Sequence, residues 1–298
     1  MKSLLTLACV LFLYAAPAFA GWSMTQVTTS SGPGEGLDLV QKIWMDGTAA
    51  KVEFMSSDNP MMEPGSYLLI QEGGKNVFMV NPKQKTYARF DIMALGEGMT
   101  GAMSGMGMEM KIVDPKMEKL LEEPGGLMLG LPTTHYRFHT SYTMNMSMPM
   151  GMKMQVPTDA VEDVWVTSAL GVGGAGEAMA AMAKSGGGGA PQELMQLTQR
   201  VRGTMVGLPL KQVTVTKTST SSKGGGAMRM LMRHGGGGGG GETSSTTTMV
   251  VKDLVEVTLP ASTFKIPAGY VESEILQRGP AMPDMNDTAM PDLGEEEN

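Results

Sequence analysis

The sequence contains very little cysteine. Its one cysteine, Cys9, lies in an N-terminal segment that we expect to be removed, so the mature chain would hold none. Without cysteine, disulfides, thiolate nucleophiles and cysteine-ligated zinc are excluded. Aromatic residues (5%) and charged residues (18%) are scarce, and the formal net charge of −7 argues against nucleic acid, whose backbone contacts need a positive surface. No later stretch approaches the roughly 18 uninterrupted apolar residues of a membrane-spanning helix.

The first twenty residues have the pattern of a secretory signal. Lys2 is followed by an apolar run over residues 4–16, and Ala18, Phe19 and Ala20 form a small-residue cleavage site before Gly21. We therefore predict a signal peptide over residues 1–20 and an exported protein, periplasmic or extracellular after cleavage near Ala20.

Glycine and methionine are abundant, with 40 and 32 residues. Three low-complexity insertions are expected, near residues 94–110, 185–190 and 223–241. Residues 277–298 turn rich in proline, methionine and acidic side chains, which predicts a disordered acidic tail. Residues 21–276 are expected to form one domain.

Short strand patterns separated by turn residues dominate that domain. Asp46-Gly47 is a strong hairpin signal, and four strand–turn units within about seventy residues predict an antiparallel meander. Expected strands cover residues 22–29, 37–44, 49–55, 67–71, 76–80, 86–92, 134–147, 152–156, 162–167, 210–221 and 243–259. Helices are expected over residues 115–123, 176–184 and 191–202, the first and last beginning at a proline.

Apolar and polar residues alternate most strictly over residues 134–156. Aromatic residues and methionines take even positions while polar residues take odd ones, so one face of this strand should be apolar. A hairpin turn is expected at residues 148–151. With Trp165 of the later strand, the predicted apolar ligand-binding residues are Tyr136, Phe138, Tyr142, Met144, Met146 and Trp165.

The same alternation argues against a histidine metal site. His135 and His139 are four residues apart, which in a strand spans about 13 Å, too far for one ion. Both fall on the polar face, and we predict surface histidines. Glu162 and Asp163 should point to opposite faces, and Glu122 and Glu123 should end a helix.

Several segments together resemble the bacterial exported domain-of-unknown-function family 4412. They cover residues 42–47, 51–53, 67–87, 162–166, 207–210 and 264–270. The resemblance extends over about residues 22–273. Such domains are similar to the outer-membrane lipoprotein carrier, whose fold is a curved antiparallel half-barrel wrapped over helices. The glycine insertions and the methionine content depart from that pattern.

We therefore expect a mainly β (α+β) protein, a curved antiparallel half-barrel sheet with one or two covering helices. No catalytic motif and no cofactor motif is present, so the expected function is non-catalytic binding of a lipid or another apolar ligand. One alternative is binding of Cu(I) or Ag(I) by methionine sulfur, at Met103, Met106, Met108 and Met110. Another is a structural role with an envelope protein partner. The oligomeric state stays open.

Overall fold

Hydrogen-bonded pairing between neighbouring strands builds one 13-stranded sheet. The computed structural model describes residues 18–32, 38–58, 62–89, 101, 104–105, 107–148, 153–170, 192–203, 205–219, 221–223 and 242–273. The strands are β1 (Ala18–Ser31), β2 (Leu39–Met45), β3 (Ala50–Ser57), β4 (Tyr67–Gln71), β5 (Asn76–Asn81), β6 (Thr86–Arg89), β7 (Glu109–Met128), β8 (Leu131–Ser147), β9 (Lys153–Thr167), β10 (Leu208–Ser219), β11 (Ser221–Lys223), β12 (Glu242–Pro260) and β13 (Val271–Glu272). The helices within the described residues are η1 (Glu72–Gly74), α4 (Gln192–Arg202) and η3 (Ala261–Phe264).

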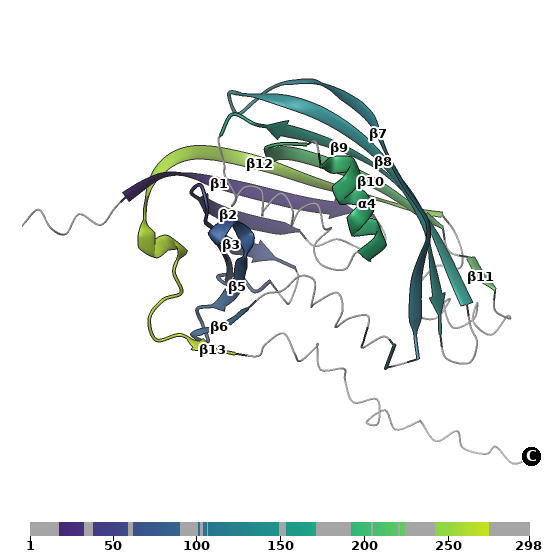
Figure 1. The fold of residues 1–298 in the computed structure, drawn as a ribbon, viewed down its shortest axis with the longest axis horizontal. Coiled ribbons are helices and arrows are strands. Elements are labelled where there is room, and N and C mark those ends of the chain that lie inside the picture. Colours follow the sequence, from purple (N-terminus) through teal and green to yellow (C-terminus); the bar gives the residue numbers. More distant parts are fainter. Residues whose placement is uncertain are drawn as a thin grey trace, which may run out of the picture.

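The strands lie in the order β13-β6-β5-β4-β3-β2-β1-β12-β10-β9-β8-β7, with β11 beside β9. Pairing is antiparallel apart from the short β13–β6 contact. The sheet bends strongly, and α4 lies inside the curve against the teal strands (Figure 1). The predicted mainly β class, an open antiparallel sheet curved like a half-barrel with a covering helix, is confirmed.

The hairpin predicted at Asp46-Gly47 joins β2 to β3. The Asp46 backbone N–H donates to the Ala49 carbonyl at 2.9 Å, and Asp46 Oδ1 accepts hydrogen bonds from the N–H groups of Thr48 and Ala49. The carboxylate thus satisfies the turn's own backbone donors, which explains why Asp-Gly was a reliable signal.

The helix predicted over residues 115–123 is wrong, because β7 runs through this segment. Its pairing with β8 shifts between Val113 and Lys116, between Lys119 and Leu121, and again near Pro124. Each shift leaves residues without a cross-strand partner, so the alternation of period two is broken and the pattern imitates a helix. Pro115 lies within the first register shift, where it has no cross-strand partner on β8, so its lack of a backbone N–H costs no hydrogen bond between the strands. Strand β9 is continuous where an interruption was expected after Val156.

The buried side chains of the described residues form three core clusters. The largest covers the inner face of β1–β4 and includes Met24, Ile43 and Phe54. A second lies between α4 and β7–β9. A third lies on the other face of the sheet, where Tyr67, Leu69 and Val80 are covered by Ile266 and Tyr270 of the C-terminal segment. Burial raises the pKa of the Tyr67 phenol to about 12.

The chain passes from α4 to β10 through Gly207. Its φ of +118° is one that L side chains rarely adopt, and an added Cβ would lie 2.2 Å from the Thr167 carbonyl oxygen. Glycine is therefore required where the helix returns to the sheet.

Some predicted features lie outside the described residues: the helix at 176–184, the insertion at 185–190, all of the insertion at 223–241 except Lys223, the tail at 277–298, and most of residues 1–20 and 94–110. Strand β1 begins at Ala18, upstream of the expected cleavage position, so residues 21–31 would remain in a mature chain. Across the ranges that are described, no helix is long and apolar enough to cross a membrane.

Phe138 tests the second cluster, because its side chain is only 1% exposed beneath α4. Phe138→Ala is expected to lower the free energy of unfolding by about 3–5 kcal/mol, since the cavity adds to the lost burial. Leu127→Ala, at a position that is 75% exposed, should change it by less than about 0.5 kcal/mol. Urea denaturation of both variants measures the difference, and equal effects would mean that α4 does not pack on β8.

Candidate functional site

The inner face of β7, β8 and β9 forms one continuous wall. The β8–β9 register is unbroken from Thr134↔Val166 to Ser147↔Lys153, so even-numbered residues of both strands share a face. Tyr136 and Phe138 are 7% and 1% exposed and pack with Val164 and Val166. The alternation predicted from Tyr136 onward is therefore present in the structure.

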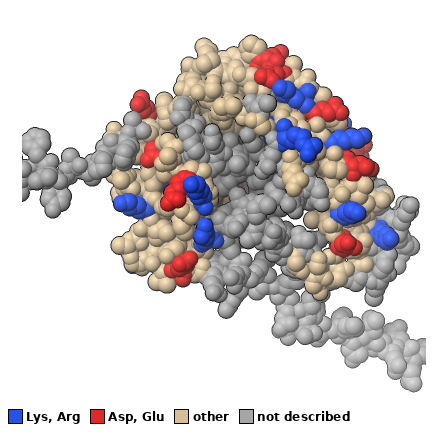
Figure 2. Space-filling model, viewed as in Figure 1, with Lys and Arg blue, Asp and Glu red and all other residues tan. Residues whose placement is uncertain are grey.

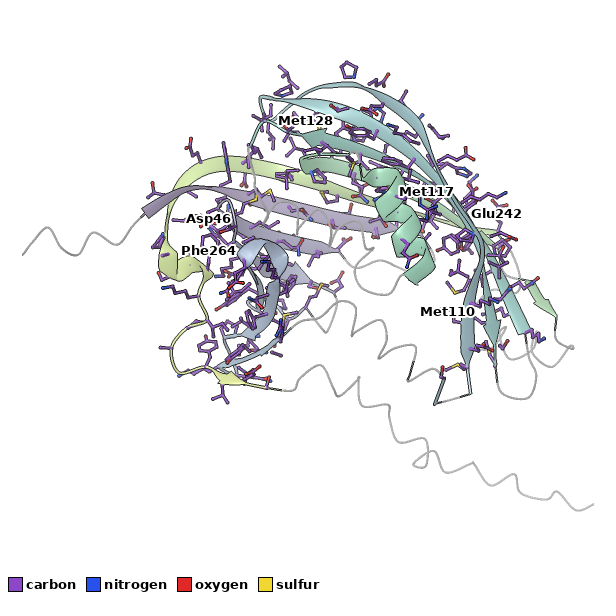
Figure 3. The ribbon with its side chains drawn as sticks, viewed as in Figure 1. Asp46, Met110, Met117, Met128, Glu242 and Phe264 are labelled. Carbon is purple, nitrogen blue, oxygen red and sulfur yellow. The ribbon has the colours of Figure 1, made fainter. Side chains whose placement is uncertain are left out.

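Helix α4 covers one half of this wall. Leu197 and Val201 of the helix, with Met205 beyond it, pack on the cluster that holds Tyr136 and Phe138. Met117 of β7 completes the contact beside the helix (Figure 3). Two predicted ligand-binding residues, Tyr136 and Phe138, are thus side chains of the protein core, with partners from the chain itself.

A buried ion pair lies in this covered half. Arg202, in the last turn of α4, pairs with Glu162 of β9, and the two side chains are only 11% and 8% exposed. The guanidinium also lies 5.2 Å from the centre of the Phe138 ring. Burial lowers the pKa of Arg202 to about 10, which still leaves it charged at neutral pH. Among described residues, Glu162 Oε1 and Arg202 Nε have no hydrogen-bond partner.

The wall continues past α4 toward the strand ends (Figure 1). We call this part the distal patch. Its members are inner-face residues in consecutive cross-strand rows, namely Met110, Ile112, Tyr142, Met144, Met146, Met154 and Val156. Of the predicted site residues, Tyr142, Met144 and Met146 belong here; each is half-buried and lies in none of the three buried clusters.

The sixth predicted residue, Trp165, lies on the opposite face. It pairs with His135 in the β8–β9 register, one residue out of step with Tyr136 and Val164. The Trp165 ring stacks on the His135 imidazole, with 4.4 Å between the two ring centres. Lys211 Nζ lies 4.5 Å from the centre of the Trp165 ring. The structure therefore does not bring Trp165 together with the five other residues.

His135 is not the surface histidine that we predicted, because it is 9% exposed. Its Nδ1 lies 3.2 Å from Glu123 Oε1 and its Nε2 lies 2.6 Å from Asp163 Oδ1. Asp163 also accepts hydrogen bonds from Arg137 Nε and Nη2. Burial alone would raise the pKa of Asp163, but the hydrogen bonds from Arg137 and His135 hold it below its ordinary value.

Close approach of β7 explains this burial. A Cβ on Gly125 would lie 2.6 Å from Thr133 Oγ1 and 2.8 Å from Trp165 Cδ1. Because glycine has no side chain, the β7 backbone closely approaches the Trp165 ring and the His135 backbone nitrogen. His139 fits the prediction better, since it is half-buried and paired only with Asp159 at 2.6 Å.

Glu162 and Asp163 point to opposite faces of the sheet, as predicted. Glu162 contacts Arg202, whereas Asp163 contacts His135 and Arg137. The pair Glu122 and Glu123 does not end a helix. Both residues lie on β7, where Glu122 contacts Lys119 and Glu123 contacts His135.

Arg202 was not recognised from the sequence as a functional or structural partner. The available signal was Glu162 itself, an acid among the apolar inner residues Val164 and Val166, since such a group needs a buried partner.

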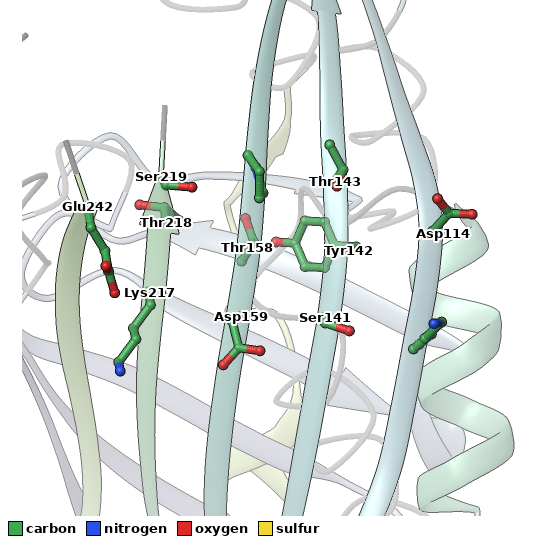
Figure 4. Close-up of a pocket in the computed structure, with 12 residues that line it drawn as sticks. Asp114, Ser141, Tyr142, Thr143, Thr158, Asp159, Lys217, Thr218, Ser219 and Glu242 are labelled. Carbon is green, nitrogen blue, oxygen red and sulfur yellow. The ribbon is translucent and has the colours of Figure 1, made fainter. Parts of the chain in front are cut away.

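A groove of about 530 Å3 also lies near the strand ends, lined by residues of β7, β8, β9, β10 and β12 (Figure 4). Most of its lining residues are polar or charged: Asp114, Lys116, Ser141, Tyr142, Thr143, Pro157, Thr158, Asp159, Lys217, Thr218, Ser219 and Glu242. Tyr142 is the one predicted ligand-binding residue among them. In the view of Figure 2, described acidic and basic side chains are intermixed over the molecule. The groove and the distal patch share Tyr142, but most groove residues are polar or charged whereas most residues of the distal patch are apolar.

The residues of the metal alternative are only partly described. Met103 and Met106 lie outside the described residues, while Met108 and Met110 are half-buried at the start of β7. Within the part of the chain that the structure describes, no group of three or more histidine, cysteine or acidic residues could hold a metal ion.

The Arg202–Glu162 pair predicts strongly non-additive mutations. Arg202→Met should lower the free energy of unfolding by about 3–5 kcal/mol, because it leaves a buried carboxylate without its cation. Adding Glu162→Leu should recover most of that loss, since an apolar pair of similar volume is often neutral or stabilising. A double-mutant cycle by urea denaturation measures the coupling, and additive losses would contradict the buried pair.

Asp163 predicts an acid-dependent stability. Its pKa is lower in the folded chain than in the unfolded chain, so its contribution is present above about pH 4 and lost as the pH falls through the folded pKa. Asp163→Asn should therefore be less stable at neutral pH and lose less stability on acidification. Unfolding curves between pH 7 and pH 2, with exposed Asp58→Asn as control, test this; parallel curves for wild type and Asp163→Asn would refute it.

No protein-family model matches the sequence, and no curated protein matches it. Among solved structures, the "Structure of PNGF-II in C2 space group" is similar at 11% identity, over 87% of this chain and 32% of that chain, with a TM-score of 0.32. The chain thus spans about a third of that protein's length. At this TM-score the likeness carries no argument about fold or function.

Proposed function

We propose that this chain is an exported, non-catalytic protein that binds an apolar ligand, such as the acyl chain of a lipid, on the distal patch. The observation that carries the proposal is the half-burial of Tyr142, Met144 and Met146 on the inside of the curved sheet. Among the described residues, α4 covers the other half of the same wall, so we place the ligand on the distal patch.

The chemistry of the distal patch suits a flexible apolar chain. Ile112, Met144 and Val156 form one cross-strand row, and Met110, Met146 and Met154 form the next. Contiguous apolar surface of this kind marks binding sites, and burying it contributes roughly 25 cal/mol per Å2. Methionine adapts to ligands of variable shape because it is unbranched and has three rotatable bonds.

The resemblance to domains similar to the lipoprotein carrier supports the same proposal, since that fold forms a half-barrel open on its inner side. Here the binding surface is displaced toward the strand ends, because α4 packs directly on Tyr136 and Phe138. Trp165 is left out of the proposed site, since it lies on the other face with His135.

A polar substitution on one face of β8 tests the proposal. Met144→Glu with Met146→Glu is expected to weaken binding of a fluorescent fatty acid to the delipidated protein by about tenfold or more, because two charges enter an apolar surface. Solvent extraction and mass spectrometry of the untreated protein should recover lipid from wild type and little from this variant.

The matched control carries the same two charges on the opposite face. Thr143→Glu with Ser147→Glu adds them to neighbouring positions of β8 and should leave probe binding unchanged. Thermal unfolding checks that both variants are folded. Equal losses in the two variants, or a wild-type protein that carries no lipid and binds no probe, would refute the proposal.

A further inference from the structure

Three methionines from three adjacent strands lie in one cross-strand row. Met110 of β7 pairs with Met146 of β8, and Met146 pairs with Met154 of β9. Residues directly opposite each other in an antiparallel pair project to the same side of the sheet. We call Met110, Met146 and Met154 the methionine row; they are far apart in sequence, and only the register brings them together.

The spacing of the row suits convergence of the three sulfur atoms. Neighbouring strands lie about 4.8 Å apart, and directly opposed Cβ atoms lie about 4.5–5.5 Å apart. The row faces the inside of the curve, because the β8–β9 register is unbroken and Met146 therefore shares a face with Tyr136 and Phe138. With three rotatable bonds each, Met110 and Met154 are able to turn their thioethers toward Met146.

The methionine row is not needed to fill the core. Met24 and Met45 are fully buried and Met117 is 8% exposed, and all three belong to buried clusters. Met110, Met146 and Met154 are half-buried and belong to none of the three described clusters. Met110 lies near the far end of β7, well past α4 and Met117 (Figure 3). These three side chains are therefore partly exposed and do not belong to the described core.

Three neutral thioethers define the kind of ligand. Thioether sulfur is a soft donor that selects Cu(I), whereas divalent Mg2+ and Ca2+ require oxygen ligands. No acidic side chain stands in the row to favour a divalent ion. The geometry points to a site for one soft monovalent cation, Cu(I), held by Met110, Met146 and Met154.

This inference goes beyond the proposed function and does not depend on it. It also differs from a site in the loop before β7, because Met110 acts here with two residues of β8 and β9. Binding is a ligand exchange without any redox step, so the redox-inert ion Ag(I) is a suitable probe.

The test combines Ag(I) titration with methionine methyl NMR of the full mature chain in chloride-free buffer. On addition of silver nitrate, the ε-methyl resonances of Met110, Met146 and Met154 should shift together and before those of other methionines. The triple variant Met110→Leu, Met146→Leu and Met154→Leu should lose these shifts. It should also lose competition for Cu(I) against a chelator under anaerobic conditions.

A second triple variant removes the same number of sulfurs elsewhere. Met55→Leu, Met79→Leu and Met128→Leu should bind the first equivalent of Ag(I) as wild type does. Ag(I) titration reports on the sulfur ligands and the fatty-acid assay reports on the apolar surface, so the two proposals are tested separately. Unselective shifts over all methionines, or equal Ag(I) affinity in wild type and the row variant, would overturn the site.

Discussion

The unbroken ladder between β8 and β9 is the constraint on which the rest of the structure depends. From Thr134 to Ser147 every residue of β8 has its partner on β9 without a bulge, so the two faces stay separate over the whole length. A slip of one residue would move the apolar side chains to the outer face and the charged ones inside. The inner wall, the outer charged network and the methionine row all rest on this register.

The two faces solve the problem of burying polar groups differently. Inside, one carboxylate, Glu162, is neutralised by Arg202 from the end of α4, which ties the helix to the sheet. Outside, Asp163 is shared between His135 and Arg137, and Trp165 shields the imidazole. Adjacent acids on one strand thus have entirely separate partners. These ion pairs link β9 to its sequence neighbours, the strand β8 before it and the helix α4 after it.

Much of the fold could be predicted because local patterns agree with it. The Asp46-Gly47 turn, the alternation after Tyr136 and the apolar spacing of α4 each reflect one element's own geometry. The predicted helix over 115–123 failed because three bulges in β7 destroy the alternation that identifies a strand.

The site was predictable only in part, for reasons of tertiary structure. Alternation correctly assigned Tyr136, Phe138, Tyr142, Met144 and Met146 to one face, but it does not show which of them α4 covers. Trp165 was wrongly grouped with them. The β8–β9 register decides which face of the sheet Trp165 shares with residues of β8, and the sequence does not show that register. The Arg202–Glu162 contact and the row of Met110, Met146 and Met154 also arise from pairing between distant segments, which leaves no local signature.

The most direct measurement of the central claim is a set of methyl nuclear Overhauser contacts from Met144. In the structure Met144 stands opposite Ile112 on one side and Val156 on the other, on the inner face. Cross-peaks from the Met144 ε-methyl group to the methyl groups of Ile112 and Val156 are the predicted result. Cross-peaks to the side chains of Lys111 and Gln155 in their place would show the register displaced by one residue and would contradict the account.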